Sequence, residues 1–116
     1  MGSIRLVYDT EGDILDVDFR LTGEKPQRAI ELHDNITAWS DAEWTTILHL
    51  TFLSYSALLA QPFLPLLGIA RLSPGQRTHL LKLLNSDPVK RFLVCQDEEK
   101  MYFRVTEPGV REAAAA

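Results

Sequence analysis

The sequence predicts a single α+β domain, made of a mostly antiparallel sheet of about five to seven strands, one clear helix near residues 74–84 and a C-terminal β-hairpin. Three observations carry this prediction. Apolar and polar residues alternate through the N-terminal half, a strong helix-start signal stands at Ser73, and a second alternating pair of segments follows the helix. A chain of 116 residues can bury a hydrophobic core without disulfides or metals.

Residues 4–53 are expected to form a β-meander. Its first two strands, near 4–8 and 14–19, are joined by a turn over Asp9–Asp13, which contains Gly12. The second strand alternates strictly, and its two faces carry Leu15, Val17 and Phe19 on one side and Ile14, Asp16 and Asp18 on the other. A second loop is predicted at residues 22–26.

Strands three, four and five are expected near residues 27–33, 36–40 and 44–52. Asp34-Asn35 between the third and fourth strands favours a type I′ turn, since both residues tolerate a positive φ. The resulting pairing sets Leu32 opposite Thr37 and Ile30 opposite Trp39. We therefore expect a core-facing set of Ile30, Leu32, Thr37 and Trp39, and an opposite set of Glu31, His33, Ile36 and Ala38.

The hinge, residues 54–72, is apolar and interrupted by prolines. Ser54 or Ser56 could cap a short helix over 57–61 that Pro62 stops. The apolar run is shorter than the roughly 20 residues that span a bilayer, so it must either pack across the sheet or dock on a second subunit. The predicted interface residues are Leu58, Leu59, Phe63, Leu64, Leu66, Leu67 and Ile69.

The third block, residues 73–106, opens with a helix in which Ser73 is the N-cap and Pro74 takes the first helical position. Strands near 91–96 and 100–106 then form a hairpin, and residues 107–116 form a tail. Whether the hairpin joins the first sheet stays open. The helix stripe expected to pack inward consists of Leu80, Leu81, Leu83 and Leu84.

Composition favours a cytoplasmic protein that binds no nucleic acid. The net charge of −4 argues against a basic nucleic-acid-binding surface. The single cysteine, Cys95, excludes an internal disulfide and suits a reducing compartment. No basic-then-apolar leader opens the chain, so secretion is not expected.

The N-terminal half resembles the domain of unknown function 2283 family of short bacterial and archaeal proteins. Tyr8-Asp9, then Asp13-Ile14-Leu15, Val17 and Phe19 match its opening pattern over residues 4 to about 55. The fifth strand departs from the family, because Ile47-Leu48-His49-Leu50 lacks its usual glycine and glutamate. The resemblance implies a β-rich fold and no established activity. Some members resemble the small partner encoded beside a ribonuclease-type toxin, which implies protein–protein binding.

Acidic residues in the first turn have the spacing Asp9, Glu11, Asp13, as in a calcium loop. Such a loop also needs a glycine and a bidentate glutamate, where this chain has Ile14 and Arg20. We expect Asp9 and Asp13 to be structural turn residues that accept backbone N–H bonds, with no metal bound.

Two histidines, His33 and His49, are expected in the sheet on the face opposite the tryptophan-bearing core, near Glu31. A metal site would require a third ligand, and none is evident. Cys95 lies mid-strand and is expected to be a small buried hydrophobe. Trp39 and Trp44 resemble stacking platforms for single-stranded nucleic acid, but core or interface packing suits an acidic chain better.

These observations predict a non-catalytic protein that acts by association, with itself as a dimer or larger homo-oligomer and with a cognate partner such as a toxin, and without a cofactor. The alternative is a small hydrolase or metal-dependent enzyme that uses His33, His49, Asp9 and Asp13. A third reading is an acidic mimic of nucleic acid built on residues 9–18.

Overall fold

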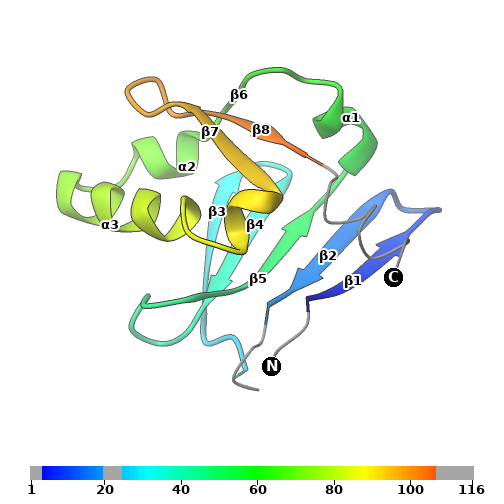
Figure 1. The fold of residues 1–116 in the computed structure, drawn as a ribbon, viewed down its shortest axis with the longest axis horizontal. Coiled ribbons are helices and arrows are strands. Elements are labelled where there is room, and N and C mark those ends of the chain that lie inside the picture. The colour runs from blue at the N-terminus through cyan, green and yellow to red at the C-terminus, as the bar shows by residue number, and fades with distance from the viewer. Residues whose placement is uncertain (1–3, 20–24, 107–116) are drawn as a thin grey trace. The chain divides into compact units, whose positions relative to one another are not determined.

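The computed structural model describes residues 4–19 and 25–106, and the chain divides into two compact units (Figure 1). Unit 1 covers residues 1–55 and unit 2 covers residues 56–116. Antiparallel sheets with a few short helices confirm the predicted α+β class. The predicted 107–116 tail and most of the predicted 22–26 loop lie outside the described residues.

Unit 1 is a five-stranded antiparallel sheet in the order β1-β2-β5-β4-β3, so β5 is central and β1 and β3 are the edges. The five predicted strands are confirmed, with shifts at their ends, and β3, β4 and β5 pair consecutively, but β2 pairs with β5 rather than with β3 as an uninterrupted meander would require. The strands are β1 (Arg5–Asp9), β2 (Ile14–Asp18), β3 (Arg28–His33), β4 (Ile36–Ser40) and β5 (Ile47–Phe52).

The two faces of this sheet differ because successive side chains point to opposite sides. One, the core face, is buried along β2, β4 and β5, whereas the other, which we call the open face, carries half-exposed polar side chains. The core face includes Leu15, Val17, Leu50 and Phe52, and the open face includes Asp16, Asp18, His49 and Thr51.

The predicted facing of β4 is wrong, whereas Ile30 and Leu32 of β3 lie on the core face as predicted. A bulge between Glu31 and His33 adds one residue to β3, so Glu31 rather than Leu32 lies opposite Thr37. Ile30 then pairs with Ala38, not with Trp39. As a result Ile36 and Ala38 are buried, and Trp39 is 37% exposed on the open face. The bulge leaves Leu32 buried, as predicted.

The turn at Asp34-Asn35 has the predicted position but not the predicted type. His33 pairs with Ile36, which confirms a two-residue loop. Neither loop residue has a positive φ, so a type I′ turn is excluded. Instead the Asn35 N–H donates to Nδ1 of His33 at 3.1 Å. The bulge in the preceding strand accommodates this alternative geometry.

Strand β5 begins at Ile47, three residues later than predicted, because the segment before it is a side-chain-stabilised loop. Oδ1 of Asp41 accepts hydrogen bonds from the Thr45 N–H at 2.7 Å and the Thr46 N–H at 3.3 Å, and Oδ2 accepts one from the Thr45 hydroxyl. Trp44 adopts φ 57° in this loop. Slight burial raises the pKa of Asp41, but the bonds from Thr45 and Thr46 lower it more, so the pKa lies below its ordinary value.

Unit 2 contains a three-stranded antiparallel sheet in the order β6-β8-β7. The C-terminal hairpin therefore pairs with the short strand β6 and does not extend the sheet of unit 1. Helix α1 (Tyr55–Leu59) starts at the end of unit 1 and, as predicted, ends before Pro62. The other elements are β6 (Leu64–Pro65), α2 (Leu67–Ala70), α3 (Pro74–Leu84), the 3-10 helix η1 (Val89–Arg91), β7 (Leu93–Asp97) and β8 (Tyr102–Val105).

Helix α3 is confirmed at the predicted residues. Ser73 and Gln76 form a capping box, in which Oγ of Ser73 accepts from the Gln76 N–H at 3.3 Å, and Pro74 begins the helix. Leu80, Leu81 and Leu84 are buried. In the hairpin Met101, Phe103 and Val105 are also buried.

Candidate functional site

A hydrogen-bonded network joins three strands across the open face of unit 1. The Trp39 indole N–H donates to Oγ1 of Thr51 at 3.2 Å, and the Thr51 hydroxyl donates to Oδ1 of Asp16 at 3.0 Å. The same Asp16 oxygen lies 3.1 Å from Nε2 of His49. The rings of His49 and Trp39 meet edge to face, with centroids 6.4 Å apart. His49 thus lies off the core face as predicted, but Trp39, which was expected in the core, lies on the same face as His49.

The hydrogen bonds of this network fix the orientation of its side chains, but they do not activate a nucleophile. An imidazole held by a carboxylate is the base half of a nucleophilic site. The hydroxyl in the network, on Thr51, donates to Asp16 rather than to His49, so the imidazole does not activate it. An open depression of about 290 Å³ lies beside the network, lined by Arg5, Val7, Asp16, Asp18 and His49.

The predicted enzyme residues are not brought together. Nδ1 of His33 is used by its own turn. Asp9 accepts the Glu11 N–H at 3.1 Å, and Asp13 accepts the Tyr8 hydroxyl at 2.6 Å. The bond to Asp9 is of the kind expected for a turn residue, whereas the bond to Asp13 comes from a side-chain hydroxyl and not from the backbone. In the part of the chain that the structure describes, no three His, Cys, Asp or Glu side chains gather as a metal site would require.

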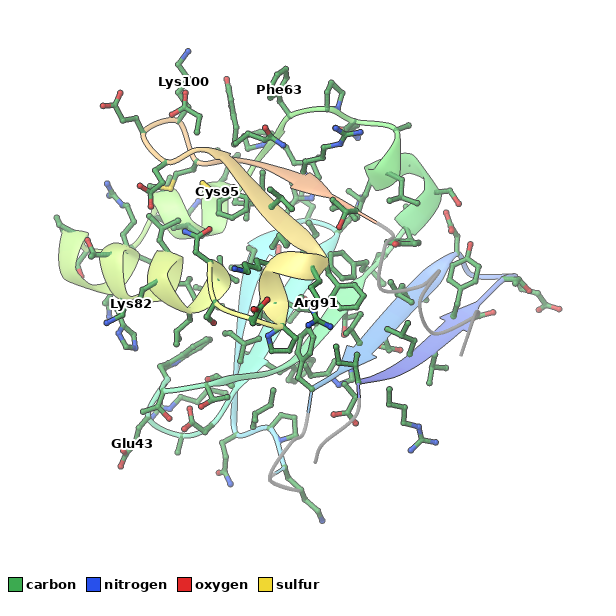
Figure 2. All side chains as sticks on the ribbon, viewed as in Figure 1. Glu43, Phe63, Lys82, Arg91, Cys95 and Lys100 are labelled. Carbon is green, nitrogen blue, oxygen red and sulfur yellow. The ribbon has the colours of Figure 1, made fainter. Side chains whose placement is uncertain are left out.

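The hinge is mostly buried inside the chain, which corrects part of the predicted interface. Leu58, Leu64, Leu66 and Ile69 have no exposed surface, so they are closed to a partner, and Leu59 is half-buried. Phe63 and Leu67 remain, at 59% and 57% exposed. Phe63 extends away from the ribbon (Figure 2), and its ring lies 5.9 Å from that of Tyr102.

Strand β1 is an edge whose middle is apolar and exposed. Val7 and Tyr8 are 52% and 42% exposed, and the pairing of β1 with β2 runs from Arg5 to Asp9 without a register shift. The strand contains no proline and no lysine. Its charges, Arg5 and Asp9, stand at the two ends, so the middle of the strand carries neither a charge, a proline nor a bulge that would discourage pairing with another chain.

The register reveals which backbone groups of β1 face outward. The Phe19 N–H donates to the Leu48 carbonyl, and bonded pairs alternate along an antiparallel ladder, so Val17 also bonds toward β5 and Asp16 bonds toward β1. A bond between β5 and β4 agrees with this assignment. The Leu53 N–H donates to the Asn35 carbonyl, so Leu53 and Thr51 bond toward β4, and Phe52 and Leu50 bond toward β2.

Val7, the partner of Asp16, consequently directs its N–H and C=O groups toward β2, as do Arg5 and Asp9. The groups of Leu6 and Tyr8 point away from the sheet. Side chains of directly paired residues share a face, so Arg5, Val7 and Asp9 lie on the open face.

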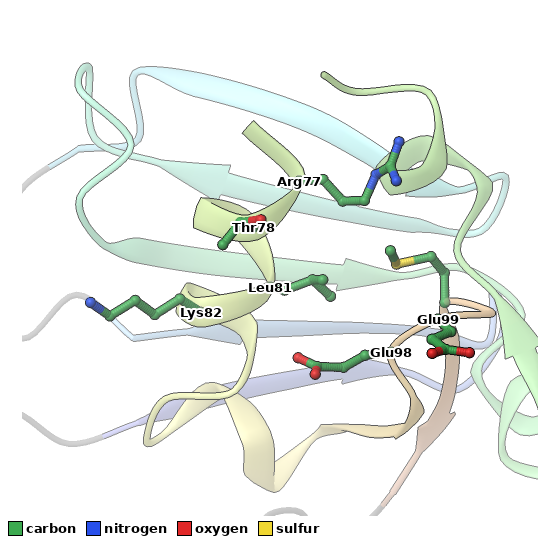
Figure 3. A pocket seen from close by; sticks show the side chains of 7 residues that line it. Arg77, Thr78, Leu81, Lys82, Glu98 and Glu99 are labelled. Atoms are coloured by element: carbon green, nitrogen blue, oxygen red, sulfur yellow. The ribbon is translucent and has the colours of Figure 1, made fainter. Parts of the chain in front are cut away.

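Unit 2 holds a larger depression, of about 560 Å³, between α3 and the β7–β8 turn (Figure 3). Leu81 and Met101 line it together with Arg77 and Glu98. Lys82 also belongs to its lining, but its side chain extends away from Glu98 in Figure 3. The Arg77 guanidinium is held by the carbonyls of Ala70 and Leu72, so it already serves to connect α2 with α3.

Cys95 is half-buried on β7 rather than fully buried as predicted. Burial and the negative charge of Glu98 raise the pKa of its thiol. The thiol is therefore protonated near neutral pH and poorly suited to act as a nucleophile.

No known protein family matches this chain, and neither a curated protein nor a solved structure is significantly similar to it. The resemblance of residues 4 to about 55 to the domain of unknown function 2283 family stays a prediction. No helix within the described residues is long and apolar enough to cross a lipid bilayer.

Proposed function

We propose that this protein works by self-association in the cytoplasm, without chemistry of its own, and that the contact is made at the edge of β1. The observation that carries the proposal is that β1 is an edge of the sheet formed by the described residues, without a bulge, with exposed apolar side chains, Val7 and Tyr8, and outward-directed backbone groups at Leu6 and Tyr8. Such an edge is a template for the strand of another chain.

The opposite edge supports this assignment by contrast. Both edges carry exposed charges, but strand β3 has one of them, Glu31, within the strand and a bulge beside it, whereas the charges of β1 stand at its ends and its pairing has no register shift. A bulge and a charge in the middle of an edge strand both discourage a further strand from pairing. The two edges of one sheet thus differ in the way that a sheet with a single binding edge requires.

The site residues of the enzyme alternative also favour a binding role. His33, Asp9 and Asp13 each accept a hydrogen bond in or beside a local turn. Exposed apolar surface remains at Val7 and Tyr8 of β1 and at Phe63 and Leu67. Exposed apolar surface of this kind is typical of protein interfaces.

A proline at Leu6 tests the proposed edge. Because the Leu6 N–H points outward, Leu6→Pro removes a donor for a partner strand and leaves the hydrogen bonds to β2 in place. The matched control is Leu6→Ala, which also removes the leucine side chain but keeps the N–H. We expect light scattering to give a dimer for the wild type and for Leu6→Ala, and a monomer for a folded Leu6→Pro.

Measurements should extend to about 300 µM, because pairing of one short strand buries less than the roughly 800 Å² per partner of a standard interface. A wild type that stays monomeric over this range would contradict the proposed function. A folded Leu6→Pro variant that remains dimeric would show that association uses another surface, for which Phe63 and Leu67 are the next candidates.

A further inference from the structure

We infer that the strand which pairs with β1 is β1 of a second copy, antiparallel, with Val7 opposite Val7. This inference rests on the self-association proposed above and names the geometry of that contact. It comes from the order of residues along β1, read together with the direction of its backbone groups.

The five residues of β1 are complementary to themselves when the strand is reversed. With Val7 at the centre, Arg5 of one copy lies opposite Asp9 of the other, and Leu6 lies opposite Tyr8. Every position thus meets a compatible partner, either opposite in charge or apolar. A two-fold axis through the Val7 pair repeats each contact twice and closes the assembly as a dimer.

The backbone of β1 fits the same register. Leu6 and Tyr8 direct their N–H and C=O groups outward, so each Leu6–Tyr8 pair can exchange two hydrogen bonds. Arg5, Val7 and Asp9 then occupy the non-hydrogen-bonded positions, where facing side chains approach most closely. The charged pairs therefore form at the positions where cross-strand side chains interact best.

Other registers are less favourable. A parallel arrangement places Arg5 against Arg5 and Asp9 against Asp9, and like charges directly opposite each other destabilise a sheet. A slip of one residue moves the side chains of the second copy to the wrong face. A slip of two residues keeps the faces but separates Arg5 from Asp9.

The charges that surround Arg5 and Asp9 do not prevent these two residues from pairing across the dimer. Arg5 has no ion pair within the described residues, although Asp18 is its cross-strand neighbour in the same sheet. Asp9 uses Oδ1 to accept the Glu11 N–H, and its Oδ2, which lies on the side of Gly12 in the same turn, has no hydrogen bond to another described residue. Asp16 and His49, which share the open face, are bonded to each other.

The decisive experiment uses two charge reversals, Arg5→Glu and Asp9→Lys, alone and mixed. Each variant alone repeats like charges at both contacts of the dimer, so we expect its dissociation constant to rise about tenfold or more. In the mixed dimer, Glu at position 5 meets Lys at position 9, and the native Asp9 meets the native Arg5. Mixing the two variants is therefore expected to restore the dimer at wild-type strength.

Matched controls carry the same charge changes away from the pairing strand: Arg71→Glu in unit 2 and Glu11→Lys in the turn. Both are expected to dimerise like the wild type. Asp9→Asn keeps an acceptor for the Glu11 N–H and removes only the charge, so it separates the ion pair from the turn. Sedimentation equilibrium of each sample, and of the equimolar mixture, gives the dissociation constants.

The outcomes separate this inference from the proposed function. If the wild type and both reversals dimerise equally, or if the mixture stays as weak as its components, the Val7-centred pairing is wrong. Self-association at β1 would then still be supported by the Leu6→Pro result. If the wild type is monomeric, both proposals fall. The Val7-centred pairing is supported if each variant by itself dimerises weakly and the mixture of the two regains the dissociation constant of the wild type.

Discussion

Replacing Ala38 by aspartate is expected to unfold unit 1. Ala38 has no exposed surface and lies between Ile30 and Leu50 on the core face of the sheet. A carboxylate there would lose its hydration without gaining a partner, which costs about 4 kcal/mol or more of unfolding free energy. Such a loss is a large share of the stability of a small unit. Urea unfolding followed by the fluorescence of Trp39 and Trp44 measures it.

The neighbouring substitution Thr37→Asp is the matched control. Thr37 is half-exposed on the open face, so its aspartate stays hydrated, and we expect a loss of about 1 kcal/mol or less. The pair of variants also separates the observed facing of β4 from the one that the sequence predicts. If Thr37→Asp were the more damaging of the two, the bulge in β3 would be misplaced.

Leu50→Ala is expected to cost about 3 kcal/mol of unfolding free energy, within the range for a buried leucine replaced by alanine. Leu50 is fully buried on the central strand β5, with Val17 and Ala38 on the neighbouring strands. Its removal leaves a cavity where two halves of the sheet meet. The same unfolding experiment reports the change.

Leu53→Ala provides the comparison for that measurement. Leu53 is 41% exposed just beyond β5, and its loss is expected to change the unfolding free energy by about 0.5 kcal/mol or less. Equal effects of the two variants would contradict the assignment of Leu50 to the core.

Local patterns predicted most of the elements because their causes are local. The alternation of Leu15 and Val17 with acidic residues determines a strand wherever it pairs, and Ser73 with Pro74 determines where α3 begins. The bulge beside Leu32 is different. One inserted residue leaves the sequence pattern of β3 unchanged and becomes visible only through its partner strand, so the predicted facing of Trp39 was wrong.

The candidate sites depended on strand order, which local patterns do not contain. His49 and Asp16 are separated by 33 positions, and they meet because β5 pairs with β2 across the intervening hairpin. The hinge was predicted as apolar chain that protein must cover, but its short elements β6 and α2 were not predicted. The alternation in β2 already indicated a polar face, and that signal would have led to the open face had the order been known.

Amide hydrogen exchange within β1 tests the central claim most directly, because it observes the edge itself. At high protein concentration, the amides of Leu6 and Tyr8 should exchange more slowly than in dilute solution. The Val7 amide, which bonds to β2, should exchange at the same rate in both. Equal exchange of Leu6 and Tyr8 at low and high concentration would show that no chain pairs with this edge, and would contradict the account.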